Sequence, residues 1–375
     1  MTNRKTISKA KRHSSKIPRD RPTIFNTFDI LKQKYSILAE ENIIILGIES
    51  SCDDTSVAVS SNSKILSNVV SSQIIHSNYG GVVPELASRA HEKNIIPVVD
   101  RAIKESGIGL DRIDAIAFTR GPGLLGSLLV GTSFAKSMGL ALNKPIIDVH
   151  HMKAHILAHF IEQENKQKPT FPFLCLTVSG GHTQIVLVKN HLDMEVIGQT
   201  IDDAAGEAFD KGAKILGLNY PGGPLIDKIS KKGDADKFKF AKPKVPGYDF
   251  SFSGLKTSFL YFIQKQRKKN PDFINQEINH LCASLQKTIV DILIERICEV
   301  SRDLGIKRVA IAGGVSANSG LRNALKKLKE EDGYNIYIPD FQYCTDNAGM
   351  ICISAYYQYK AGLFADQNIV CSARI

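Results

Sequence analysis

The sequence predicts an α/β protein built from two similar halves with a ligand cleft between them. The chain has 375 residues, more than one hydrophobic core usually serves, and 43% of them are hydrophobic. A unit of strand, small-residue turn and strand over residues 42–60 recurs over residues 171–188. A duplicated domain would give such a repeat. Because β-hairpins are common, chance similarity is the alternative.

The first half is predicted over residues 43–170. Aliphatic runs predict its strands, and apolar residues at helical spacing predict its helices. In order, we expect strands over 42–49, 55–60 and 64–72, a helix or broken pair of helices over 84–106, a strand over 113–119, a helix over 127–142, a strand over 145–149 and a helix carrying several histidines.

The second half is predicted over residues 171–345, and a helix over 346–370 completes the first half. Its elements are expected as strands over 174–178 and 183–188, a helix over 275–304, a strand over 308–312, a helix from 319 and a strand near 336. Between residues 225 and 270 the regular pattern dissolves, which predicts a basic insertion.

The formal charge of +10 is unevenly distributed. Residues 1–42 hold ten Lys or Arg against four acids, and residues 225–270 hold twelve against four. Both segments suit a polyanionic partner such as RNA, and solvated lysines are the alternative. Residues 1–42 are predicted to form a disordered basic extension; an organelle transit peptide is the other interpretation.

The cysteines indicate the redox state of the compartment, and the apolar segments indicate whether the chain spans a membrane. Seven cysteines form no CxxC pair, which suits buried thiols in a reducing compartment. Residues 123–142 are the most membrane-like window, but Lys136 and repeated Gly, Ser and Thr make spanning unfavourable. We therefore expect a soluble, cytoplasmic protein, with a mitochondrion or plastid as the alternative because of the basic segment over residues 1–42.

A histidine pair is the first candidate for chemistry. His151 and His155 are four residues apart and share one face of the predicted helix, so both imidazoles can reach one metal ion. Asp346, at the start of the last helix, is a candidate third ligand. The alternatives are an incidental histidine pair and an ordinary helix N-cap.

Three turns of small residues each follow a predicted strand, over residues 50–55, 179–183 and 313–318. Bare backbone N–H groups in such turns can approach phosphate oxygens. None matches a Walker A or Rossmann fingerprint, and ordinary tight turns are the alternative. Asp210, close before the Pro-Gly-Gly turn at 221–223, can accept hydrogen bonds from ligand hydroxyls, although it also suits a surface helix.

Taken together, these segments resemble the tRNA N6-adenosine threonylcarbamoyltransferase family of the bacterial TsaD type. The resemblance covers roughly residues 43–362. Its motifs occur in order as Gly47–Thr55, Gly80–Glu85, Ala87–His91, Gly121–Gly123, His151 with His155, Val178–Thr183, Asp202–Lys211, Tyr220–Pro224, Phe250–Lys256, Gly313–Val315 with Asn318, and Thr345–Asn347.

The resemblance implies a fold and a reaction. The fold is that of actin, Hsp70 and sugar kinases, with two ribonuclease-H-like halves around a cleft. The reaction transfers threonylcarbamoyl from threonylcarbamoyl-AMP to N6 of adenosine 37, next to the anticodon, in tRNAs that read codons beginning with adenine. The expected partners are tRNA, a synthase that makes the adenylate, a metal-less TsaB-type paralogue and a small TsaE-type ATPase, with no membrane.

The resemblance also assigns residues. It implies one divalent metal, Fe²⁺ before Zn²⁺ or Mn²⁺, held by His151, His155 and Asp346, with Asp53 and Asp54 near the chemistry. The substrate-binding residues it implies are Thr177, Val178, Ser179, Gly180, Gly181, Asp210, Gly223, Asp227 and Asn318.

The chain departs from the family pattern at three places. Asp54 stands where Glu is commoner, Lys153 lies between the histidines where many relatives have an acid or an amide, and residues 1–42 have no counterpart. The side chain of Asp54 is one methylene shorter than that of Glu.

Three other functions are alternatives: a metalloprotease, an ATP-driven kinase or ATPase, and a non-catalytic scaffold. A metalloprotease helix needs Glu directly after its first His, where this chain has Met152. An ATP-driven kinase or ATPase of the same fold does not need a histidine metal site, because magnesium prefers oxygen ligands. A non-catalytic scaffold does not need all three ligands.

Overall fold

The structure, a computed structural model, describes residues 42–375. The predicted basic extension over residues 1–42 lies outside this range apart from Asn42. Residues 43–375 form one compact unit that contains two five-stranded sheets. The strand orders are β3-β2-β1-β4-β5 and β10-β9-β6-β7-β8.

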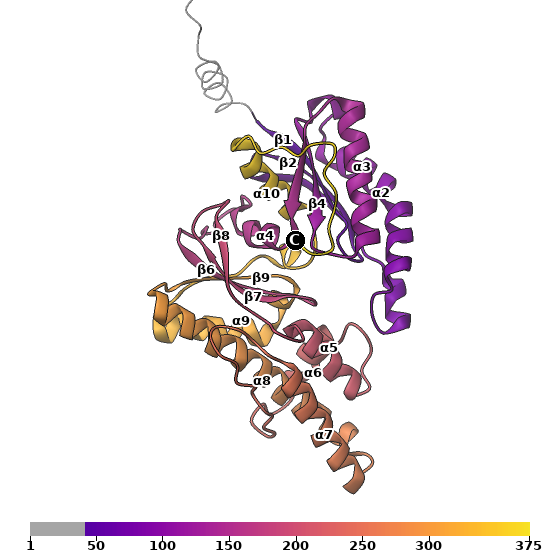
Figure 1. Cartoon of the computed structure of the whole chain (residues 1–375). Helices are drawn as coiled ribbons and strands as arrows, with labels where there is room; N and C mark the ends of the chain where they lie inside the picture. The colour runs from indigo at the N-terminus through magenta and orange to yellow at the C-terminus, as the bar shows by residue number, and fades with distance from the viewer. Residues whose placement is uncertain (1–41) are drawn as a thin grey trace, which may run out of the picture. The chain divides into compact units, whose positions relative to one another are not determined.

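The first sheet joins an antiparallel meander to two parallel strands. Strands β1, β2 and β3 form the meander, β4 pairs in parallel with β1, and β5 pairs in parallel with β4. Helices α2 and α3 cover one face (Figure 1). The bounds are β1 Ile44–Glu49, β2 Thr55–Ser61, β3 Lys64–Ser71, η1 Ile74–Tyr79, α2 Pro84–Ser106, η2 Leu110–Arg112, β4 Ala115–Gly121, α3 Leu125–Leu142 and β5 Ile146–His150.

The second sheet repeats this plan. Strands β6, β7 and β8 form an antiparallel meander, β9 pairs in parallel with β6, and β10 pairs in parallel with β9. The predicted duplication is therefore confirmed. The bounds are β6 Phe173–Val178, β7 Thr183–Val188, β8 Met194–Gln199, α5 Ala205–Ile215, α6 Gly222–Ser230, α7 Ser253–Lys269, α8 Phe273–Leu304, β9 Arg308–Ala312, η4 Gly314–Ala317, α9 Ser319–Asp332, β10 Asn335–Tyr337 and η5 Phe341–Tyr343.

Helices α4 (His151–Leu157) and α10 (Ala348–Lys360) contribute to a core shared by both sheets, and η3 (Ala158–Phe160) follows α4. Alternate residues of β6 divide between two cores: Phe173 and Cys175 pack toward α4 and α10, whereas Leu174 and Leu176 pack toward α8. This alternation follows from the two-residue period of a strand buried on both faces. The shared core holds α4 between strands of both halves.

The region over residues 225–270 is more regular than its composition suggests. The prediction that regular structure dissolves there is wrong for residues 225–230, which belong to α6, and for residues 253–269, which form α7. Leu255, Phe259 and Ile263 recur at helical spacing and are buried in the core of the second half. Packing of this apolar stripe, rather than the composition of the loop before it, decides the fold of the segment.

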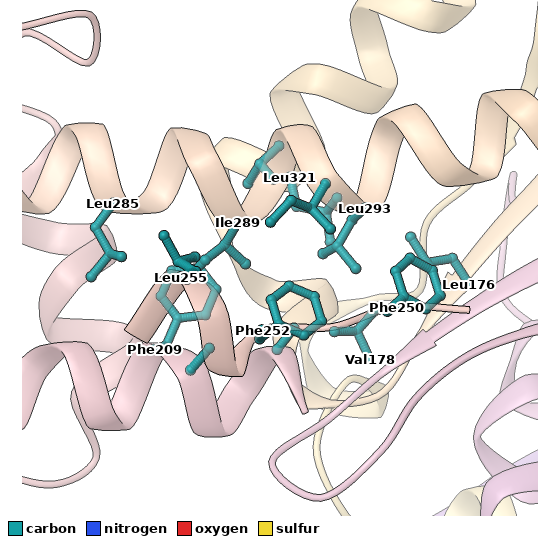
Figure 2. Close-up of a cluster of buried hydrophobic side chains, with 14 of the residues drawn as sticks. Leu176, Val178, Phe209, Phe250, Phe252, Leu255, Leu285, Ile289, Leu293 and Leu321 are labelled. Atoms are coloured by element: carbon teal, nitrogen blue, oxygen red, sulfur yellow. The ribbon is translucent and has the colours of Figure 1, made fainter. Parts of the chain in front are cut away.

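The aromatic residues of the same region pack mostly inward. Phe250 and Phe252 lie in the cluster that Figure 2 shows, together with Phe209 and residues of α8. Phe240 is buried against Phe259, with ring centroids 4.9 Å apart. Their burial shows that these aromatic rings pack against their own domain.

The helix predicted over residues 346–370 is too long: α10 ends at Lys360, close before Gly362, whose φ of 70° lies in the left-handed region. Residues 84–106 form the single helix α2, one of the two forms expected there, and this helix contains Pro97. Among the described residues, α3 is the one helix long and apolar enough to cross a membrane, and a third of it (33%) is buried. It packs against β4 and α2.

Candidate active site

A cavity of about 750 Å³ lies where the three predicted turns meet, and we call it the main cavity. Each turn follows the carboxyl end of a strand that pairs in parallel with another, where ligands bind in open α/β sheets. The turn residues that line it are Ser51, Cys52, Asp53, Asp54, Ser179, Gly180, Gly181, His182, Gly314, Val315, Ala317 and Asn318. The structure therefore brings all three turns to one site.

His151 and Asp346 line this cavity, and His155 lies beside Asp346 without lining it. Oδ1 of Asp346 lies 3.1 Å from Nε2 of His155 and 3.4 Å from Nε2 of His151. One ligand atom from each residue lies within 4.8 Å of the others. The helical spacing of α4 places the two imidazoles side by side, while Asp346 comes from the turn directly before α10.

A buried carboxylate stands behind the first histidine. Oε2 of Glu49, at the end of β1, lies 3.0 Å from Nδ1 of His151, and Glu49 is fully buried. Thr119 donates a hydrogen bond of 2.6 Å to the same carboxylate, and the Ser51 amide donates another. These contacts orient Nε2 of His151 toward Asp346, as carboxylates behind metal-binding histidines commonly do.

The charges in this cluster favour a cation. Burial opposes ionisation, yet the two histidines hold the pKa of Asp346 far below its usual value. Burial likewise opposes protonation of His151, but Glu49 and Asp346 raise its pKa well above the ordinary value. Both shifts favour a positive charge between Nε2 of His151 and Oδ1 of Asp346. Two imidazoles and a carboxylate with open positions are donors that suit a divalent transition metal.

Asp53 and Asp54 both line the main cavity. Burial raises the pKa of Asp54 to about 6. Repulsion from Asp346 raises this pKa further by a smaller amount, whereas a hydrogen bond with Ser72 lowers it. A carboxyl group with a pKa in this range can exchange protons near neutral pH. Although its side chain is shorter than the Glu that is commoner at this position, Asp54 lines the main cavity.

Three predicted binding residues serve partly as helix caps. Oδ1 of Asp210 accepts the N–H groups of Gly222 and Gly223 at the start of α6, at 2.8 and 3.2 Å. Oδ1 of Asp227 accepts the N–H and hydroxyl of Ser319 at the start of α9.

Asn318 caps α9 itself, because its Oδ1 accepts the N–H of Leu321 at 3.0 Å. Together with Gly223, the capping residues Asp210, Asp227 and Asn318 line the main cavity. They fix the two helix starts against it.

Thr177 and Val178, which were also predicted to bind substrate, are not among the residues that line the main cavity. Both belong to the end of β6, and both side chains are fully buried beneath the turn that follows. Thr177 Oγ1 is 3.8 Å from the Cys175 sulfur. Their side chains support the turn at 179–181 rather than form the cavity wall.

Several cavity residues were not predicted. Lys228 on α6, Lys231 directly after that helix, Tyr220 before it and His182 also line the main cavity. Glu49 ends a buried strand, and a carboxylate at the end of an apolar run is a sequence signal of a buried partner. The two lysines belong to the basic segment over residues 225–270.

The chain matches one protein family over most of its length. The family model of the tRNA N6-adenosine threonylcarbamoyltransferases (TsaD) matches residues 64–353. A protein of that name from Riemerella anatipestifer is 62% identical over 331 residues, which are 88% of this chain and 97% of that protein. Another from Thermosipho africanus is 51% identical over 330 residues, 87% of this chain and 98% of that protein.

Solved structures with low sequence identity share the fold. HypF from T. kodakarensis superposes with a TM-score of 0.57 at 16% identity, over 86% of this chain and 48% of that one. Full-length HypF in a phosphate- and nucleotide-bound form gives a TM-score of 0.55 at 15% identity, over 90% and 48%. The two sheets are accordingly two ribonuclease-H-like halves of the actin and Hsp70 type, as expected.

Proposed function

Because this chain belongs to the tRNA N6-adenosine threonylcarbamoyltransferase family, we propose that it transfers threonylcarbamoyl from threonylcarbamoyl-AMP to N6 of adenosine 37 in tRNAs reading codons that begin with adenine. The observation that carries the proposal is the main cavity, where three small-residue turns meet His151 and Asp346. In this reaction the N6 nitrogen bonds to the carbonyl carbon, the bond from that carbon to the phosphate oxygen breaks, AMP leaves, and the amine loses a proton.

The proposed metal fits the residues present. His151, His155 and Asp346 would hold one divalent ion, and we propose Fe²⁺ before Zn²⁺ or Mn²⁺. When bound, such an ion supplies Lewis acidity toward a carbonyl oxygen. Glu49 holds the His151 ring in place for this role.

The turns and capping residues suit the adenylate. An added Cβ on Gly180 or Gly181 would meet no atom within 4 Å, so the backbone is open to the cavity at both residues. Backbone N–H groups in such a turn can approach phosphate oxygens closely. Asp210 and Asp227, on the opposite wall, can accept hydrogen bonds from ribose hydroxyls. These contacts would orient the donor, which matters because an aromatic amine is a weak nucleophile.

Proton removal from the amine falls to Asp53 or Asp54. Both line the main cavity, and the pKa of about 6 that burial gives Asp54 suits a base working near neutral pH. Asp54 is thus the better matched proton acceptor, and Asp53 is the alternative. Replacing each in turn with Asn and measuring the pH profile of transfer separates them.

Helix α7 suits contact with the tRNA backbone. It carries Lys256, Lys265, Arg267, Lys268 and Lys269 and no acidic residue. Tyr261, on the same helix, is 65% exposed. Exposed cations beside an exposed aromatic ring are typical of nucleic-acid contacts. We propose that α7 holds the tRNA while its anticodon loop reaches the main cavity.

A protein partner fits the outer face of α2 and α3. Ile96, Leu125, Leu129 and Leu140 expose half or more of their side chains there. We propose that a metal-less paralogue covers this face, and that a small ATPase and an adenylate synthase complete the system. Sedimentation of the mixed proteins should give a complex that Leu129→Asp abolishes. Leu363→Asp, at an equally exposed site after α10, should leave the complex intact.

The test of the reaction is a transfer assay on the purified chain with its partners. Threonylcarbamoyl-AMP is prepared separately, and an unmodified tRNA with adenosine after the anticodon is the acceptor. Modified adenosine that forms without ATP hydrolysis by this chain supports the proposal. If the chain instead transfers phosphate from ATP to a small molecule and never modifies tRNA, it is a kinase of the same fold. If no activity appears with every partner present, it is a scaffold.

A further inference from the structure

A second cavity of about 370 Å³ adjoins the main cavity. The helix α4 that presents His151 to the main cavity lines the second one with Met152, Lys153 and Ile156. Pro122 and His182 line both cavities. The two spaces therefore meet beside the histidine cluster.

The lining of the second cavity combines apolar side chains with amides. Strands β7 and β8 contribute Val186, Met194 and Val196, which offer an apolar surface. Gln184 and Gln199 come from the same strands and can donate and accept hydrogen bonds. An apolar slot with a few amides is the chemistry that holds a flat heteroaromatic ring and reads its edge.

The rim of the second cavity carries two cations. Lys153 and Arg374 line it and are exposed, and the lining contains no acidic side chain; its one carboxyl group is the terminal one of Ile375. His150 also lies in the lining. Two exposed cations at the mouth of an apolar slot suit a base that is still attached to its phosphate backbone.

We propose that the second cavity receives the adenine base to be modified, unstacked from the RNA, so that its amine reaches the main cavity between Pro122 and His182. The inference rests on the proposed function and assigns a separate place to the acceptor, because the donor adenylate occupies the main cavity. A volume of 370 Å³ lies in the range of sites that enclose a small ring. Lys153 then contacts the phosphates next to the target nucleotide.

The test fills the second cavity without touching the main one. Val196 lies on β8, lines the second cavity and is 49% exposed, so Val196→Trp adds an aromatic side chain at its mouth without burying it in a core. Glu195→Trp adds the same side chain to the neighbouring residue, which does not line the cavity and forms an exposed ion pair with Lys189. It is the matched control.

Three quantities are measured on the full chain with its partners. The first is the fluorescence change of an anticodon stem-loop RNA with 2-aminopurine directly beside the target adenosine, which reports unstacking of that adenosine. The second is the affinity for AMP, which reports the main cavity. The third is threonylcarbamoyl transfer. Val196→Trp should lower the fluorescence change and the transfer rate by about tenfold or more with AMP affinity unchanged, and Glu195→Trp should match the wild type in all three.

The results separate the two proposals. If Val196→Trp transfers and unstacks the base as the wild type does, the second cavity is not the acceptor site, although the transferase assignment stands. The inference is also overturned if the wild type transfers without any fluorescence change. If the wild type binds AMP and RNA but transfers nothing, the proposed function fails, and the inference falls with it.

Lys153→Ala should weaken RNA binding, and Lys153→Arg should restore it.

Discussion

Nδ1 of His151 lies 3.0 Å from the carboxylate of Glu49, a residue with no exposed surface. The two residues are 102 positions apart in the sequence, and the parallel strands of the first sheet bring them together. Burial opposes ionisation of Glu49, yet the adjacent His151 keeps its pKa below the ordinary value. The acid therefore stays charged and fixes the ring whose other nitrogen faces Asp346.

Glu49→Gln should weaken divalent metal binding. Loss of the carboxylate behind a ligating histidine typically costs about 10- to 100-fold in metal affinity. Competition with a chelator of known affinity measures this, with Glu85→Gln, on the exposed surface of α2, as the control. Equal affinities for the two variants would show that Glu49 does not support the metal site.

Gly206→Ala should lower stability, whereas Gly181→Ala should weaken AMP binding. An added Cβ at Gly181 meets no atom within 4 Å, whereas at Gly206 it would lie 2.5 Å from the Ser179 carbonyl oxygen. Gly206→Ala should therefore lower the free energy of unfolding by about 1–3 kcal/mol. Gly181→Ala should leave stability unchanged and weaken AMP binding by about tenfold, because its methyl group enters the cavity. Chemical denaturation and calorimetric titration measure both, and AMP affinity unchanged in Gly181→Ala would contradict the binding role.

His159 should make stability fall as the pH falls. It is buried, and its Nε2 is 2.9 Å from the Ile311 carbonyl oxygen. Burial lowers its pKa to about 4 from 6.5, so between these values the unfolded chain binds a proton that the folded protein does not. The free energy of unfolding should lose up to about 3 kcal/mol from pH 6.5 to 4. In His159→Gln this part of the pH dependence should disappear; an unchanged slope would contradict the assignment.

Removing two cations from α7 should weaken RNA binding and its salt dependence. Lys265 and Lys268 are exposed on that helix. If each contacts one phosphate, the double alanine variant should reduce the slope of log affinity against log salt by about 2. The double alanine variant of Lys326 and Lys327, both exposed on α9, is the control and should behave as the wild type. Filter binding at several salt concentrations measures the slopes, and equal slopes would remove α7 from the RNA contact.

The sequence predicted local features of the site better than long-range ones. The four-residue spacing of His151 and His155 indicated a shared helix face, because that relation is fixed by helix geometry. Asp346 could not be placed near them, since the contact depends on α10 packing against the first sheet. The partnership of Glu49 with His151 depends on strand order in the same way.

In the fold, too, local features were predicted better than those that depend on packing. The repeated unit of strand, turn and strand was predictable, because aliphatic runs mark buried strands. Strand β8 (Met194–Gln199) was missed, because most of its side chains are not buried and it has no aliphatic run. Helix α7 was missed because lysines and glycines obscured an apolar stripe of Leu255, Phe259 and Ile263 at helical spacing. Residues 84–106 were expected as one helix or a broken pair, and the single helix α2 continues through Pro97 because Ile95 and Val98 are buried in the core.

The central claim is that this chain transfers threonylcarbamoyl to tRNA at a site built on His151, His155 and Asp346. The most direct test compares the wild type with the His151→Ala, His155→Ala double variant in the transfer assay, with thermal melting as the check of folding. We predict modified adenosine from the wild type and none from a folded variant that no longer binds metal. Equal transfer by the two proteins would contradict the account.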